Sequence, residues 1–318
     1  MAPDRSRFIV TSSPHLFMGD DTRGVMRDAL LALLPALAAS AYFFGWRALW
    51  VTGVCVGSCV GAEWAFQRLA SRTVRTGDLS AAVTGILLAF CLPPGTPWWA
   101  AAVGGVVSIV LGKEVFGGLG HNIFNPALVG RAVLLASFPV QMTTWTFPAR
   151  SIPSPFAGVD AVASATPLAA AKGMAAAFPH WDLFVGQVGG SIGETSALAL
   201  LLGGGFLLLR GVIDWTIPAA FIVSTAALCG LLGADPLGHL LAGGLLLGAF
   251  FMATDYVTSP LSRRGRLLFG AGCGLLTVLI RLYGGFPEGV CYAILIMNSL
   301  VPLIDRFTLP VPFGGRRP

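Results

Sequence analysis

Long apolar runs, separated by short polar segments, fill most of this 318-residue chain. Hydrophobic residues make up 55% of it and charged residues only 11%, and the mean hydropathy is +0.78. Soluble domains average about 25% charged residues, so the pattern predicts an integral membrane protein. The net charge of +5 comes from basic residues at the ends of apolar runs, which membrane topology explains better than nucleic-acid binding.

A helix that crosses a bilayer needs about 20 apolar residues, and ten runs approach or reach that length. We expect these spans at about 28–46, 48–67, 79–92, 97–116, 124–139, 195–210, 213–233, 238–256, 266–283 and 288–304. The short runs among them are tolerated where neighbouring helices cover the backbone, as in transporter-like bundles. The predicted fold is therefore an all-α polytopic membrane protein.

The distribution of Lys and Arg predicts the orientation, because cytoplasmic loops accumulate these residues. With the N-terminus inside, the cytoplasmic side receives Arg5, Arg7, Arg23, Arg27, Arg68, Arg72, Arg75, Lys113, Arg210, Arg263, Arg264, Arg266, Arg306, Arg316 and Arg317. The outer side receives only Arg47, Arg150, Lys172 and Arg281. Both termini are thus expected in the cytoplasm, and the N-terminus lacks the apolar core of a signal peptide.

This orientation divides the chain into five segments. They are a cytoplasmic lead at 1–27, a first membrane half at 28–139, a long outer loop at 140–194, a second membrane half at 195–304 and a cytoplasmic tail at 305–318.

The two membrane halves resemble each other weakly. Residues 85–97 and 248–260 each begin with Gly and end with Pro, and an aromatic-Gly-Gly sequence follows at 116–118 and 283–285. The two copies would run through the membrane in opposite directions, so the pattern predicts two inverted repeats. The alternative is chance recurrence of turn residues in a chain with 41 glycines.

Ionisable side chains at membrane depth are costly, and each is therefore a candidate for function. The candidates for an ion pathway are Glu63, Lys113, Glu114, Arg131 and Asp255. Simple structural alternatives exist: Glu63 could pair with Arg68, and Lys113 with Glu114 near the inner surface. Arg131 is predicted to lie deepest and needs a carboxylate, carbonyl or phosphate partner, while Asp255 is expected at the corresponding level of the second repeat.

Two further motifs have both structural and functional interpretations. The segment "GGLGHNIFNPALVG", residues 117–130, predicts a tight re-entrant turn that opens a helix at Asn125, and such a helix start favours anions. The six cysteines all fall in apolar runs and are interpreted as packing residues. Cys55 and Cys59 share one helix face and would supply only half of a metal site, so no metal is expected.

The segment "GVDAVASATPLAAAKG", residues 158–173, consists of small residues and lies in the longest polar gap of the chain. By itself, Thr166 followed by Pro167 predicts a helix N-cap, since Thr caps helices and Pro favours the first helical position.

Several stretches together resemble a known family. "SPHLF", "LSAAVTGILLAFCLPPGTPWW", "KEVFGGLGHNIFNPALVGRAVLLASFPVQMTTW" and "DAVASATPL" are similar, in order and spacing, to the D subunit of the Rnf complex and to the related B subunit of the sodium-pumping NADH:quinone reductase. The similarity is nearly end to end and most specific at 113–145 and 160–168. The short N-terminal lead favours the Rnf D subunit. The resemblance implies a helical core of the urea-transporter type.

In that family, a threonine in the sequence Asp-x-x-(Ser/Thr)-Gly-Ala-Thr carries FMN through a phosphoester bond, installed by a separate flavin transferase. The resemblance implies that Thr166 carries FMN, that Asp160 is the leading aspartate and that Ala165 belongs to the closing pair. Ala163 and Ser164 stand where the family has a hydroxyl residue and glycine. A second, non-covalent riboflavin is also implied.

The implied function is that of a multi-pass subunit of the cell (inner) membrane, assembled with Rnf subunits of the A, B, C, E and G types. It would relay electrons between ferredoxin and NAD, coupled to the movement of Na⁺ or H⁺. The quinone-reductase B subunit is the alternative within the family. A cofactor-free transporter or channel is the alternative outside it, and this alternative leaves the segment from Asp160 to Thr166 unexplained.

Overall fold

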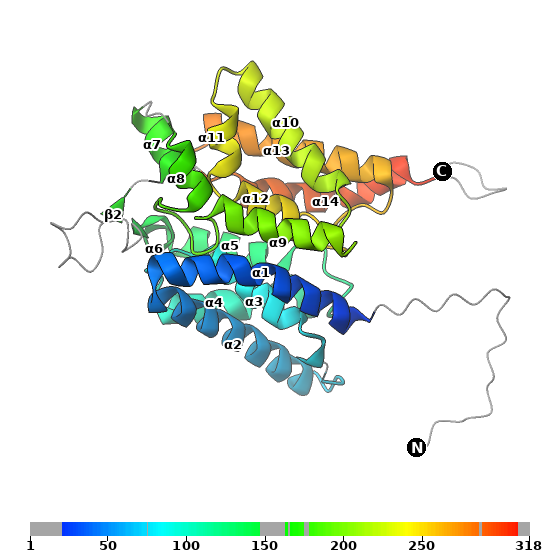
Figure 1. Cartoon of the computed structure of the whole chain (residues 1–318). Coiled ribbons are helices and arrows are strands. Elements are labelled where there is room, and N and C mark those ends of the chain that lie inside the picture. Colours follow the sequence, from blue (N-terminus) through cyan, green and yellow to red (C-terminus); the bar gives the residue numbers. More distant parts are fainter. Residues whose placement is uncertain are drawn as a thin grey trace.

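The computed structural model describes residues 21–74, 76–146, 163–164, 166–174, 178–285 and 288–310, so most of the predicted cytoplasmic lead and tail lies outside the described residues. The described chain is a bundle of helices (Figure 1). In order, the elements are α1 (Thr22–Phe44), α2 (Trp46–Leu69), η1 (Thr76–Asp78), α3 (Ser80–Phe90), α4 (Trp98–Ile109), η2 (Val110–Glu114), α5 (Pro126–Ser137), α6 (Pro139–Thr143), β1 (Trp145–Thr146), β2 (Ala163–Ser164), α7 (Pro167–Met174), α8 (His180–Val185), α9 (Ala197–Leu209), α10 (Thr216–Leu231), α11 (Pro236–Leu241), α12 (Leu245–Leu247), η5 (Gly248–Met252), α13 (Arg263–Tyr283) and α14 (Val290–Thr308). Strands β1 and β2 form one short antiparallel pair.

Each of the ten expected spans has a helical counterpart, and the protein is an all-α polytopic membrane protein as predicted. Helices α1, α2, α13 and α14 are long and apolar enough to cross a membrane, while α3, α5, α9 and α10 are shorter apolar helices. The eighth span, expected at 238–256, is broken. It consists of α11, α12 and the π-helical turn η5, and Gly243 and Gly244 form the break, each with φ of +66°. Glycine suits this left-handed conformation because it has no Cβ.

The two halves of the molecule pack in the same way. Helix α2 packs against α4 and α4 against α5, just as α10 packs against α13 and α13 against α14. In the first half, Gly105 of α4 lies against Ser58 of α2, whose hydroxyl donates to the carbonyl three residues earlier. In the second, Gly274 of α13 lies against Ser224 of α10, whose hydroxyl does the same. Small residues let membrane helices approach closely, and here the same arrangement occurs twice.

Ion pairs join several helices at the end of the bundle where α1 begins and α14 ends (Figure 1). Arg210 donates to Asp28 of α1 at 2.9 Å, and Arg266 of α13 donates to Asp214 at 3.0 Å. The pKa of the Asp214 carboxyl lies below its usual range because the Thr216 hydroxyl donates to it and Arg266 pairs with it. We call this end the basic end, after Arg27, Arg68, Arg210, Arg263 and Arg306. The opposite end, with α6, α7 and α8, is called the Thr166 end.

Short elements enter the bundle from opposite ends. Helix α3 begins at Ser80, which lines a cavity at the basic end together with Asp255, the third residue after η5. Helix α3 therefore runs away from the basic end, and α12 and η5 run toward it, as inverted repeats require. Helix α5 also begins inside the protein. The Asn125 side chain accepts from the N–H groups of Ala127 and Leu128 at 3.1 and 3.4 Å, which confirms the predicted turn and helix start.

Gly85 tests the close packing of α3 on α2. A Cβ at this position would lie 2.6 Å from the Cα of Val56, so Gly85→Ala must push the two helices apart. We expect a loss of about 1 to 3 kcal/mol in the free energy of unfolding, as for other overpacked sites, measured as a lower Tm in detergent. Gly57→Ala is the control, because nothing lies within 4 Å of its added Cβ. Equal Tm values for the two variants would contradict the packing.

Candidate functional site

Thr166 lies at the N-terminus of α7. Its hydroxyl oxygen accepts from the N–H of Ala169 at 3.2 Å, which confirms the predicted N-cap. Only 5% of the residue is exposed. Of the other residues predicted from the family motif, Asp160 and Ala165 lie outside the described residues, and Ser164 is described only through its backbone in β2.

Thr166 lines a small cavity with about 310 Å³ of empty space, which we call the Thr166 cavity. Its walls come from α7, α8, the segment before α9 and the break between α11 and α12. The residues that matter below are Leu168, Leu183, Glu194, Thr195, Gly243 and Glu288.

A second cavity, of about 260 Å³, shares the carboxylates of Glu194 and Glu288 with the Thr166 cavity. We call it the Arg131 cavity. Arg131 of α5 donates to the Glu288 carboxylate and to the carbonyl of Cys91, and its guanidinium lies 3.5 Å from Glu194. The side chain is only 9% exposed, and a buried charge requires such partners. The carboxylate and carbonyl predicted as alternatives for Arg131 are both present.

Arg281 is the second buried arginine near this region. Its guanidinium donates to the carbonyls of His239, Ala242 and Gly243 at 2.5, 2.9 and 2.9 Å. The sequence count assigned Arg281 to the outer side, and the structure buries the residue inside the protein, where it is only 2% exposed. The physical reason is the helix break, which leaves carbonyl groups without N–H partners until the guanidinium satisfies them.

A larger cavity, with about 830 Å³ of empty space, opens at the basic end. Most of its lining is apolar, and its polar lining residues include Ser80, Lys113, Asn122, Asn125, Thr254 and Asp255. Asp255 accepts from the Thr258 hydroxyl at 3.3 Å. The Asn125 amide donates to the carbonyl of Met252, at the end of η5, at 3.2 Å. We call this space the basic-end cavity.

Lys113 and Glu63 form a buried ion pair beside that cavity. The Lys113 ammonium donates to the Glu63 carboxylate, and also to the Ser80 hydroxyl at 2.6 Å. The two side chains are 2% and 1% exposed. Glu63 of α2 therefore pairs with Lys113 of η2 rather than with Arg68, the partner considered from sequence.

Glu114 has different partners from its neighbour Lys113. Its carboxylate accepts from the Gln67 amide at 2.9 Å and lies 3.6 Å from Arg72. Consecutive residues of a helical turn point in different directions, so the two side chains do not form the pair considered from sequence. Glu63, Lys113 and Glu114 nevertheless all lie where α2 packs against η2.

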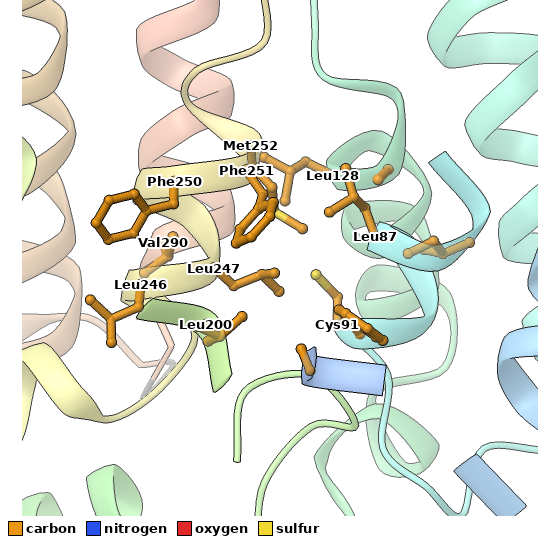
Figure 2. Packing of buried hydrophobic residues seen from close by; sticks show 14 of the residues in the cluster. Leu87, Cys91, Leu128, Leu200, Leu246, Leu247, Phe250, Phe251, Met252 and Val290 are labelled. Atoms are coloured by element: carbon orange, nitrogen blue, oxygen red, sulfur yellow. The ribbon is translucent and has the colours of Figure 1, made fainter. Parts of the chain in front are cut away.

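Apolar side chains separate the basic-end cavity from the Arg131 cavity. Leu87 and Phe251 line the former, while Leu128, Leu247 and Met252 line the latter. Figure 2 shows these side chains, from both halves of the protein, gathered around one central region. We call these five residues the apolar layer.

Sequence reasoning did not single out two acidic residues of these cavities. Glu194 and Glu288 each precede an apolar span as isolated acids. A buried Arg131 predicts that some carboxylate must face it, but only the fold shows that two distant loops supply one each. Arg281 was noticed only as a topology marker.

Comparison with known proteins identifies the family. Residues 9–314 match the model of the NQR2, RnfD, RnfE family. The chain belongs to this family. It is 48% identical to the D subunit of the Na(+)-translocating ferredoxin:NAD(+) oxidoreductase complex of Acetobacterium woodii, over 96% of this chain and 95% of the relative. It is 43% identical to the D subunit of the Proton-translocating ferredoxin:NAD(+) oxidoreductase complex of Clostridium ljungdahlii, over 98% and 97%.

A third relative is the D subunit of the Ion-translocating oxidoreductase complex of Stutzerimonas stutzeri, 43% identical over 91% of each chain. The resemblance to Rnf D subunits, first inferred from short motifs, is thereby confirmed over nearly the whole chain.

The Glu63 and Lys113 pair can be tested by a double-mutant cycle. Removing one partner leaves the other charge buried, which costs about 3 to 5 kcal/mol. We therefore expect Glu63→Gln and Lys113→Met each to lower Tm strongly, and the double variant to be more stable than either single variant. A double variant whose loss equals the sum of the single losses would show that the two residues are not coupled.

Proposed function

We propose that this protein is the membrane-embedded D subunit of an ion-translocating ferredoxin:NAD⁺ oxidoreductase complex, in which it carries FMN on Thr166 and relays electrons. The observation that carries the proposal is the position of Thr166 in an RnfD family member: it begins α7 and lines a cavity that adjoins the buried charges around Arg131. Its relatives are named as subunits of such complexes, so catalysis would belong to the assembly. A flavin transferase would install the FMN.

The residues around Thr166 fit a phosphoester. The N-terminus of α7 presents the N–H of Ala169 to the threonine oxygen, and a helix N-terminus favours the negative charge of a phosphate. Arg131, in the adjoining cavity, offsets the charge of Glu194 and Glu288. The bound flavin would supply one-electron transfer, and the protein would supply its position and electrostatic surroundings. Because Thr166 is 5% exposed, we infer that the transferase acts before α7 packs.

We place the basic end in the cytoplasm and the Thr166 end at the outer face of the cell (inner) membrane. The support is the accumulation of arginines at one end, which marks the cytoplasmic side of membrane proteins. The flavin-bearing threonine would then lie on the opposite side from ferredoxin and NAD, and other subunits of the complex would have to complete the electron route.

The basic-end cavity is our candidate site for a second, non-covalent flavin such as riboflavin. Its empty space of about 830 Å³ falls within the range of roughly 300 to 1,000 Å³ typical of cofactor pockets. Apolar walls with a few polar groups, among them Asn122 and Asn125, suit an aromatic ring with hydrogen-bonding edges.

We further propose that ions pass between the basic-end cavity and the Arg131 cavity when the apolar layer opens. The buried residues Glu63, Lys113 and Glu114 and the half-buried Asp255 would act on the basic side and Arg131 on the other. One relative is named for Na⁺ and another for protons, so family membership alone does not fix the ion.

A cofactor-free transporter is the second candidate function, favoured by the same two cavities and the apolar layer between them. The quinone-reductase B subunit is less well supported, because the relatives described above are all D subunits of ferredoxin:NAD⁺ or ion-translocating oxidoreductase complexes. Covalent flavin is the property that separates the proposed function from a transporter.

Covalent flavin is tested by in-gel fluorescence of the denatured protein after coexpression with a flavin transferase. We expect a fluorescent band for the parent and for Thr166→Ser, which keeps a hydroxyl, and none for Thr166→Ala. Thr195→Ala is the matched control, because Thr195 is a buried threonine in the same cavity and should leave the band intact. A band that persists in Thr166→Ala, or a parent without one, would reject the assignment.

The second flavin is tested by acid precipitation, which leaves covalent flavin in the pellet and releases bound flavin into the supernatant. Ala29→Trp adds a large side chain to the wall of the basic-end cavity, so we expect at least about a fivefold loss of supernatant flavin at unchanged pellet flavin, as a filled pocket excludes its ligand. Ala38→Trp, on an exposed face of the same helix, is the control. Equal amounts of supernatant flavin in the two variants would show that the second flavin does not bind in this cavity.

A further inference from the structure

A short non-helical break separates α11 from α12. Gly243 and Gly244 are consecutive residues with φ of +66°, a conformation that residues with a Cβ rarely adopt. Helix α11 ends at Leu241 and α12 begins at Leu245, and Ala242 is extended, so the change of direction between them falls in residues 242–244. We call Gly243 and Gly244 the glycine hinge.

Leu168, two residues after Thr166, is seated on this hinge. A Cβ built on Gly243 would lie 2.2 Å from Leu168 Cδ1, so the leucine fills the space that a side chain at the hinge would need. Leu168 is 4% exposed and belongs to a small hydrophobic cluster with Leu183, Val188 and Ala242, separate from the main core. The start of α7 is thus in direct van der Waals contact with the hinge.

Two charged residues hold the other sides of the hinge. The Arg281 guanidinium donates to the Ala242 and Gly243 carbonyls, each at 2.9 Å. A Cβ built on Gly244 would lie 2.3 Å from Glu194 Oε1, so that carboxylate, which pairs with Arg131, rests on the hinge as well. The hinge is therefore in contact with the Thr166 cavity on one side and with the buried charges on the other.

The element that follows the hinge contributes most of the apolar layer. Leu247 lies in α12, and Phe251 and Met252 lie in η5, which continues α12 without a break. Figure 2 shows these side chains directed toward Leu87 and Leu128 of the first half. A rotation at the glycine hinge would therefore move three of the five layer residues together.

We propose that Leu168 is a positioning residue that couples the flavin-bearing segment to the ion route by pressing on the glycine hinge. The proposal rests on the proposed function, in which Thr166 carries flavin and the apolar layer closes the route. A change in charge or position at Thr166 displaces α7. Leu168 transmits this displacement to Gly243. The following elements α12 and η5 then move, and Leu247, Phe251 and Met252 of the apolar layer move with them.

The test uses the complete purified complex, with this protein as its D subunit, in sealed vesicles. The measured quantity is ion uptake per electron transferred from reduced ferredoxin to NAD⁺, followed with ²²Na⁺ and with a pH-sensitive dye. Leu168→Ala should lower this ratio about fivefold or more, at the lower end of couplings between distinct sites. Because the ratio is taken per electron transferred, a slower rate of electron transfer alone does not change it. Leu168→Met, which refills the space, should restore the ratio.

Leu183→Ala is the matched control, because it removes the same number of atoms from the same cluster, and Leu183 is not among the atoms nearest to the added Cβ of Gly243. Equal ratios in Leu168→Ala and Leu183→Ala overturn the coupling role of Leu168. A parent complex without covalent flavin or electron transfer would instead refute the proposed function, so the two failures are distinct.

A second variant acts from the opposite side of the hinge. Arg281→Lys removes the guanidinium that holds the Ala242 and Gly243 carbonyls and leaves α7 untouched. We expect the same fall in the ratio with flavin retained. If Leu168→Ala loses its flavin, the proposal is tested by Arg281→Lys alone. An unchanged ratio of ions to electrons in Arg281→Lys would reject the role of the glycine hinge.

Discussion

The structure depends on hydrogen bonds that satisfy backbone carbonyls where helices end inside the bundle. In a bilayer there is no water to do this, and each unsatisfied group costs several kcal/mol. Three side chains meet the requirement here: Arg131 at the end of α3, Asn125 at the end of η5 and Arg281 at the end of α11. Without them, the carbonyl groups at these three helix ends would lack a hydrogen-bond donor inside the protein.

This requirement also explains why charge lies at membrane depth. An arginine that satisfies a carbonyl brings a positive charge with it, and that charge in turn requires a carboxylate. Glu194 and Glu288 supply carboxylates for Arg131 from the segments before α9 and α14. Architecture and candidate function therefore share Arg131, which satisfies the carbonyl at the end of α3 and also lines the cavity next to the Thr166 cavity.

The two ends of the bundle hold different kinds of cavity. The basic end holds the larger, mostly apolar cavity with the pair of Lys113 and Glu63 at its edge, and the Thr166 end holds the small charged cavities. Between them, apolar side chains from α3, α5, α12 and η5 meet. While this layer is closed it opposes the passage of ions, because an ion in contact with it would lose its hydration without gaining a polar partner.

Much of this could be predicted from sequence, because hydropathy, small residues and basic clusters are local properties. The ten spans, the repeat, the turn before Asn125 and the cap at Thr166 all follow from short-range patterns. Pairings could not be predicted. Glu63 binds Lys113, 50 residues away, and Arg131 binds Glu288, 157 residues away, because partners are chosen by the fold. The break at Gly243 was missed since the run of apolar residues continues through it.

The proposed flavin is attached to one oxygen atom, the hydroxyl of Thr166, and peptide mass spectrometry can identify that attachment point. Trypsin cleaves after Arg150 and Lys172 and so releases one peptide that contains Ser151, Ser154, Ser164 and Thr166. From protein made together with a flavin transferase, we predict a peptide heavier by one FMN less one water, with fragment ions that place the addition on Thr166. An unmodified peptide, or an addition on one of the serines, would contradict it.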